Sequence, residues 1–265
     1  TVNVVDLTAS GKTPDEIFNA AGETLYASRK MVGTNLLRVA RLQHDRQTQE
    51  NAMTRPDGIN LLTDTASLAV INGKPSSNTT VKKITQLERH SKNFIAKSPF
   101  CVLATSSSEG CDASPRGDAP GFVYCLDNTT LLIPERPGNR IADSMRNIIK
   151  EPEMGLLFLI PGRDDTLRIN GRGYLTDHTP YLELLTARAK TPKLAVVLDI
   201  TEIYFHCAKA FIRSGLWNIN SHMPADELPT LGTMILEQIN GEPPSKELQA
   251  NIDKALEEDS KFNLY

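Results

Sequence analysis

The fold is decided by residues 100–134, which read FCVLATSSSEGCDASPRGDAPGFVYCLDNTTLLIP. Short runs of β-branched and apolar residues alternate here with turn signals at 108–110 and 127–130. This pattern is typical of strands joined by hairpins. We therefore predict four strands in this stretch, at about 100–106, 111–118, 122–126 and 129–134.

The same pattern returns further along the chain, so the sheet is expected to be larger than four strands. Three more strands are predicted at about 154–160, 166–176 and 194–208, with helices at about 138–150 and 180–189. Most connections are hairpins, and one helix separates the fourth strand from the fifth. We expect a mainly β, α+β fold: an antiparallel sheet closed into a small barrel, with flanking helices. The sequence has no GxGxxG, P-loop or HExxH motif.

The chain before the barrel is predicted to be helical. Residues 1–58 contain a capping box, in which Thr13 precedes Pro14 and Glu16 follows three residues after the threonine. A short helix is expected from Asp64 to the turn at 72–73. A longer helix is expected from 78 to 98, because apolar residues recur there at spacings of three, three and seven: Val81, Ile84, Leu87 and Phe94.

These patterns divide the chain into three parts. We expect a helical N-terminal extension at 1–58, a barrel domain at 59–240 and an acidic helical tail at 241–265. With 265 residues, of which 40% are hydrophobic and 23% charged, the composition is that of a globular protein.

Charge and cysteine usage exclude several classes of partner. The formal net charge of −3 lacks the positive field typical of nucleic-acid binding, so no nucleic-acid partner is expected. The four cysteines form no CxxC pair, so neither a metal site nor a disulfide framework is predicted. The apolar runs are far shorter than the ~20 residues that a membrane span needs, and residues 1–7 lack a secretory signal pattern. A cytoplasmic protein without a membrane partner is the expectation.

The segment 134–140, Pro-Glu-Arg-Pro-Gly-Asn-Arg, has the features of an anion site. Gly138 permits close approach, and Arg140 offers a bidentate cationic group. Asn139, Ser144 and the free amides of the following helix add neutral donors. A phosphate group fits such a site. The alternative is a solvated surface with ion pairs among Arg136, Arg140, Glu135 and Asp143.

The segment 114–118, Ser-Pro-Arg-Gly-Asp, is unusual for a strand because proline removes a ladder donor and glycine weakens a strand interior. Such a strand suits a ligand lying against its backbone. A flat heterocycle fits, with Arg116 stabilising negative charge on the ring and Asp118 accepting from a ring N–H or orienting the arginine. The alternative is an edge-strand bulge with an Arg116–Asp118 surface contact.

Several ordered motifs together resemble one family. Residues 94–217 look like the flavin-binding split barrel of the pyridoxamine 5′-phosphate oxidase superfamily, in particular an uncharacterised branch of FMN-dependent enzymes. The motifs that carry the resemblance lie at 94–105, 112–122, 131–134, 137–140, 155–162, 167–171 and 206–209.

The resemblance implies a homodimer that binds FMN at its interface and transfers electrons between a small-molecule donor and an acceptor. Arg116, Gly117 and Asp118 would flank the isoalloxazine ring. The remaining implied contacts are Ile133 and Pro134 along the ring and ribityl chain, Asn139, Arg140 and Ser144 at the phosphate, and Arg168 and Trp217 from the other subunit.

Two alternatives to an FMN-dependent oxidoreductase remain open. The same motifs describe a binding site, so they equally support a flavin carrier or redox sensor without turnover. Members of the wider superfamily also bind haem or a deazaflavin, and His206 or His178 would then be the haem ligand to test. The motif of the true oxidase for substrate phosphate is not evident in this chain, which disfavours pyridoxamine phosphate as the substrate. The resemblance gives no catalytic acid or base.

Overall fold

The computed structural model describes residues 58–73, 81–138 and 140–262. The helices predicted within 1–57 lie outside the described residues. The described residues fall into two compact units. Residues 81–227 form one unit, and residues 58–73 and 228–262 belong to the other.

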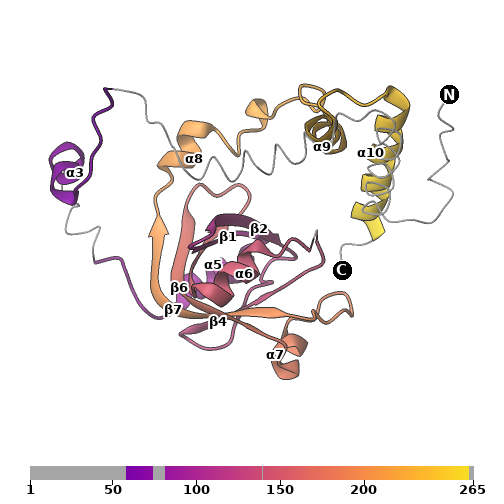
Figure 1. Ribbon diagram of the computed structural model, residues 1–265. Coiled ribbons are helices and arrows are strands. Elements are labelled where there is room, and N and C mark those ends of the chain that lie inside the picture. The colour runs from indigo at the N-terminus through magenta and orange to yellow at the C-terminus, as the bar shows by residue number, and fades with distance from the viewer. Residues whose placement is uncertain (1–57, 74–80, 139, 263–265) are drawn as a thin grey trace. The chain divides into compact units, whose positions relative to one another are not determined.

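The larger unit is built on one antiparallel sheet of seven strands in the order β2-β1-β5-β6-β7-β4-β3 (Figure 1). The mainly β fold with flanking helices is therefore confirmed. The sheet does not close, because the described edge strands β2 and β3 pair with β1 and β4 but not with each other. The open edge agrees with the split barrel that the resemblance implies. The strands are β1 (Phe100–Ser107), β2 (Gly110–Gly117), β3 (Tyr124–Cys125), β4 (Thr130–Pro134), β5 (Glu153–Leu159), β6 (Thr166–Thr176) and β7 (Ala195–His206).

Alternating burial along the strands explains why they form one core. In β1, Cys101 and Leu103 are fully buried, whereas Val102 between them is half-buried on the opposite face. The same alternation in β5 buries Leu156 and Phe158. A period of two therefore directs one face of each strand into a shared apolar interior.

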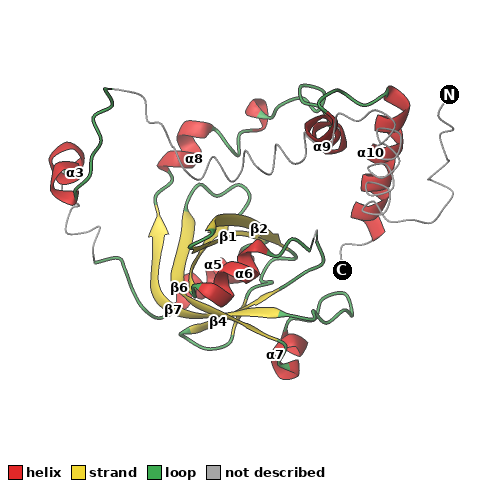
Figure 2. Ribbon diagram, in the orientation of Figure 1, coloured by secondary structure: helices red, strands yellow, loops and turns green. Residues whose placement is uncertain are grey.

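Two helices lie inside the curve of the sheet, as Figure 2 shows. They are α5 (Arg89–Lys97) and α6 (Asp143–Lys150), and α6 packs on β1, β2 and β6. A capping box starts α5, because the Glu88 carboxylate accepts from the Ser91 amide and the Ser91 hydroxyl accepts from the Glu88 amide. Two short helices, α7 (Thr179–Leu184) and α8 (Lys209–Ser214), lie at either end of β7 in sequence.

The helix predicted over 78–98 is wrong in its first half. Within 81–88 the chain is not helical, and Ile84 instead forms a bridge with Ile203 of β7. β4 pairs with β7 only from Ala195 to Asp199, so the backbone at Ile203 has an unused edge. The Ile84 amide donates to the Ile203 carbonyl at 3.0 Å, and the Ile203 amide donates to the Ile84 carbonyl at 2.7 Å. This tertiary pairing overrides the local helical pattern.

The helix predicted from 138 begins at Asp143 instead. Arg140 and Ala142 both have φ of 60°, a left-handed conformation that cannot continue a right-handed helix. The loop before α6 therefore bends away from the helix axis and forms a rim next to β2.

The other unit contains three described helices, α3 (Thr65–Asn72), α9 (Leu231–Asn240) and α10 (Lys246–Phe262). α3 lies between Asp64 and Gly73, where the sequence predicts it, and the Asp64 side chain caps its start. α9 approaches α10 so closely that a Cβ on Gly232 would lie 2.6 Å from Ile252. A 3₁₀ turn, η2 (Ile219–Ser221), belongs to the larger unit and lies between α8 and α9 in the chain. None of the helices within the described ranges is both long and apolar enough to cross a membrane.

Candidate functional site

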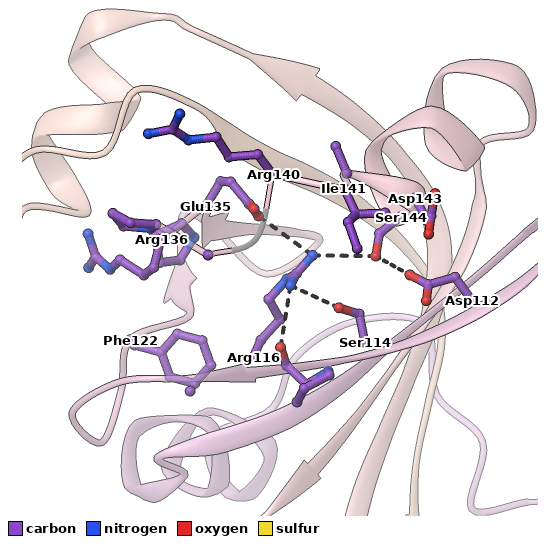
Figure 3. Close-up of a pocket in the computed structure, with 16 residues that line it drawn as sticks. Asp112, Ser114, Arg116, Phe122, Glu135, Arg136, Arg140, Ile141, Asp143 and Ser144 are labelled. Carbon is purple, nitrogen blue, oxygen red and sulfur yellow. Dashed lines mark hydrogen bonds and ion pairs between the residues drawn. The ribbon is translucent and has the colours of Figure 1, made fainter. Parts of the chain in front are cut away.

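A cavity of about 410 Å³ lies between β2, the loop after β4 and the start of α6 (Figure 3). We call it the β2–α6 pocket. Five of the ten residues singled out from the sequence line it: Arg116, Gly117, Pro134, Arg140 and Ser144.

Strand β2 supplies one wall of the pocket. Its half-buried face carries Asp112, Ser114 and Arg116 at alternate positions, while Ala113 and Pro115 between them are exposed. The three polar side chains of β2 therefore share one face of the strand, the face that lines the pocket. The pocket owes its polarity to this alternation.

Arg116 is the centre of the hydrogen-bond network in the pocket (Figure 3). Its Nη1 donates to Ser114 Oγ at 3.0 Å and to the Pro115 carbonyl at 3.3 Å. Its Nη2 donates to Ser144 Oγ at 3.4 Å and lies 3.6 Å from a Glu135 carboxylate oxygen. The Nε atom is buried and has no hydrogen-bond partner among the described residues. The guanidinium is thus held in place with one donor unused.

Two carboxyl groups, those of Asp112 and Glu135, interact with Ser144 and Arg116 in the pocket. The Ser144 hydroxyl donates to Asp112 in a short hydrogen bond. Burial raises the pKa of the Glu135 carboxyl above its ordinary value, and the Arg116 charge opposes this rise. The site therefore holds a cation, Arg116, that can bind an anionic ligand. It also holds a carboxyl group, Glu135, whose ionised form would be disfavoured by a second negative charge beside it.

The N-terminus of α6 opens onto the same pocket. Its N-cap residue is Ala142, which has no side chain to accept from the first amides of the helix. Those amides have no partner within the helix, and the helix dipole adds partial positive charge at this end. Together with Arg116 and Ser144, the helix start makes an environment suited to a phosphate or carboxylate.

Comparison with known proteins relates the part of the chain that carries this pocket to a family. Residues 87–207 match the family model described as pyridoxamine 5′-phosphate oxidase. These residues form a domain of the pyridoxamine 5′-phosphate oxidase superfamily. Among curated proteins, none matches this chain.

Solved structures similar to the oxidase-superfamily domain come from several bacteria. HupZ of Group A Streptococcus is 17% identical, with 44% of this chain and 91% of that chain covered and a TM-score of 0.37. A candidate pyridoxamine 5′-phosphate oxidase of Lactobacillus delbrueckii is 20% identical, with 46% and 98% covered and a TM-score of 0.37. An FMN-binding protein of Syntrophomonas wolfei is 13% identical, with 44% and 83% covered and a TM-score of 0.36.

Two of the predicted site residues at β2 and β4, Asp118 and Ile133, are described and do not line the pocket. Asp118 is 2% exposed and pairs with Arg136 Nε at 2.7 Å, while Arg136 Nη2 also donates to the Leu185 carbonyl at 2.9 Å. Asp118 therefore ties the end of β2 to the segment after α7. The Ile133 side chain is 1% exposed and belongs to the core. Asn139 lies outside the described residues.

The two residues predicted to contact a flavin from the other subunit lie away from the pocket of their own chain. The Arg168 guanidinium is 5.4 Å from the centroid of the Tyr204 ring. The Trp217 indole donates to the Arg163 carbonyl at 2.8 Å and stacks on Phe211. A contact of either residue with a second subunit stays a prediction.

The sequence prediction omitted several residues that line the pocket. A period of two back from Arg116 would have found Asp112. Glu135 and Arg136 lie in the same motif as Arg140, but their roles as partners of Arg116 and Asp118 depend on which strands meet. Phe122 and Ile141 also line the pocket, and no sequence signal singles them out.

Proposed function

We propose that the oxidase-superfamily domain binds FMN in the β2–α6 pocket, as a homodimer, and that the protein is an FMN-dependent oxidoreductase acting on a small molecule. The observation that carries the proposal is the Arg116–Ser144 network at the uncapped start of α6. The family match of residues 87–207 and the resemblance of the motifs support flavin as the ligand.

The polar end of the pocket suits the phosphate of FMN. Arg116 carries a buried Nε without a described partner, which an anionic oxygen can satisfy. The α6 amides would supply neutral donors, and Arg140 on the rim would add charge. In Figure 3 the Arg140 guanidinium extends away from Ser144, so Arg116 is the stronger candidate for the direct contact.

The rest of the pocket suits a flat ring. Phe122, Pro134 and Ile141 offer apolar surface, and Gly117 leaves the β2 backbone accessible. A volume of about 410 Å³ is within the range of small-molecule sites. When bound, FMN would supply the electron-transfer chemistry, while the chain would supply binding, orientation and electrostatics.

A second copy of the chain would complete this arrangement. The outer face of β1, β5 and β6 carries a groove lined by Val102, Ala104, Leu157 and Arg168. Apolar residues on an outward sheet face are what a subunit contact needs. The homodimer is proposed from the resemblance, and this groove is the surface that we assign to it.

The absorption spectrum of the purified full chain tests the cofactor, followed by heat release and identification of whatever is released. Bound FMN at about one copy per chain is the expected result. A colourless protein that does not take up added FMN would refute the proposal. A protein that binds FMN, but whose flavin no donor or acceptor reduces or reoxidises in stopped-flow experiments, would be a flavin carrier instead of an enzyme.

A further inference from the structure

Three cationic side chains surround one tyrosine on the outer side of the sheet. The Nζ atoms of Lys82 and Lys83 lie 5.4 and 5.3 Å from the centroid of the Tyr204 ring. The Arg168 guanidinium carbon lies 5.4 Å from the same centroid. We call these four residues, together with the adjacent Glu202 and His206, the Tyr204 cluster.

The backbone fixes this cluster from three parts of the chain. Arg168 of β6 is the register partner of Tyr204 in β7. The bridge between Ile84 and Ile203 brings the two lysines to the same place. Lys82 Nζ also donates to the Phe205 carbonyl at 3.2 Å. Tertiary pairing, and not sequence proximity, has therefore gathered the positive charge.

The positive charge of the cluster is only partly balanced. Glu202 pairs with Lys83 at 2.6 Å and accepts from the Asn170 amide at 3.0 Å. Within the described parts of the chain, no carboxylate forms an ion pair with Lys82 or Arg168. The tyrosine ring attracts cations through its π face but carries no charge to cancel theirs. The charges of the exposed Lys82 and the half-buried Arg168 are therefore without an ion-pair partner among the described residues.

The pKa of His206 responds to the unbalanced positive charge of the cluster. Its ring centroid is 4.6 Å from that of Tyr204, and its Nε2 is buried without a hydrogen-bond partner among the described residues. Burial lowers the pKa of His206, and the charges of Arg168 and Lys82 lower it further. The histidine is therefore neutral at pH 7, and the charge of the cluster comes from the lysines and the arginine.

We propose that the Tyr204 cluster is a binding site for a small organic dianion, a phosphate monoester or a dicarboxylate. Two negative charges match the two unbalanced positive ones. The guanidinium of Arg168 provides paired donors, the Lys82 and Lys83 ammonium groups provide charge from the facing segment, and the Tyr204 ring provides an apolar surface. None of these residues lines the β2–α6 pocket of its own chain. Arg168 also lines the groove that we assign to the second copy, whereas Lys82, Lys83 and Tyr204 do not, so the dianion would bind beside that contact.

The site is tested by following the His206 ring by NMR as the full chain is titrated with pH, with the signal assigned by its loss in His206→Gln. Sodium sulfate and disodium succinate are the two probes, each compared with sodium chloride at equal ionic strength. Each dianion is expected to raise the pKa of His206, because it cancels charge from Arg168 and Lys82. A response to sulfate only would indicate a phosphate ester, and a response to succinate only a dicarboxylate.

Variants separate dianion binding at this cluster from a general effect of salt and from binding in the β2–α6 pocket. Arg168→Gln should weaken dianion binding roughly ten-fold, because one charge-assisted contact is lost. Arg172→Gln is the matched control on the same strand, since Arg172 is exposed and pairs with Glu153 at 3.1 Å. Arg116→Ala impairs the β2–α6 pocket and should leave the His206 response intact. The proposal is overturned if neither dianion shifts His206, or if Arg168→Gln responds as strongly as Arg172→Gln.

Discussion

At the scale of single residues, the β2–α6 pocket depends most on Arg116. Its guanidinium bonds to a hydroxyl on its own strand, a hydroxyl on α6 and a carboxylate after β4. Removing it would leave Glu135 half-buried without its cation, at the point where we place the FMN phosphate. No other side chain described in the pocket joins all three walls.

Arg116→Ala should weaken FMN binding ten- to a hundred-fold, or about 1.5–3 kcal/mol, because a charge-assisted contact is lost. Quenching of flavin fluorescence during titration measures the affinity. Arg140→Ala is the matched comparison. The sequence favours Arg140 as the phosphate ligand, but its guanidinium extends away from Ser144 in Figure 3, so we expect the smaller loss. An equal or larger loss of FMN affinity in Arg140→Ala would contradict this assignment and indicate that Arg140 contacts the phosphate.

Glu135 makes stability depend on pH. Burial raises its pKa in the folded state above the ordinary value of 4.5, so its protonated form is the one that folding favours. The stability it contributes is present below pH 4.5 and is lost as pH rises through the folded-state pKa. Glu135→Gln cannot ionise, so its free energy of unfolding should rise relative to wild type between pH 4 and pH 7. Urea denaturation measures the difference, and a decrease over this range would contradict the assignment.

At the scale of elements, the long strands β6 and β7 are held together around a bulge. The register between them shifts at Asn170 and Gly171. A Cβ on Gly171 would lie 2.0 Å from the Asp199 carbonyl oxygen, which is backbone and cannot rotate away. The glycine is needed for the close approach of the two strands.

Gly171→Ala should destabilise the domain by about 2–3 kcal/mol, because the strands must separate to admit the methyl group. Urea unfolding measures the loss. Gly138→Ala is the matched control, since nothing lies within 4 Å of its added Cβ. Gly138 lines the pocket, so this variant should change flavin affinity more than stability. Equal stability of the two variants would contradict the close approach at the bulge.

At the scale of the whole molecule, the proposed function needs two chains. We expect light scattering during gel filtration to give twice the chain mass of 29.2 kDa. Leu157→Glu puts a charge in the groove on the outer sheet face and should yield monomers. Leu184→Glu, on the exposed side of α7, is the matched control and should remain dimeric. A monomeric wild type, or a dimeric Leu157→Glu, would refute the assigned interface.

The sequence by itself determined the strands and the chemistry of two motifs. Its period of two and its turn residues were sufficient for all seven strands, because these signals are local. It also singled out the 114–118 and 134–140 segments, and the structure brings Arg116, Arg140 and Ser144 to one pocket. Their role in binding FMN stays a prediction.

Only the tertiary structure decided which groups pair. Ile84 leaves its helical pattern because β7 offers it an unused backbone edge, and Asp118 pairs with Arg136 instead of Arg116. Glu135 becomes the partner of Arg116, and two lysines join Arg168 around Tyr204. Each of these contacts joins residues from different elements. Local propensity carries no information about which elements meet, so the register of the folded sheet had to supply it.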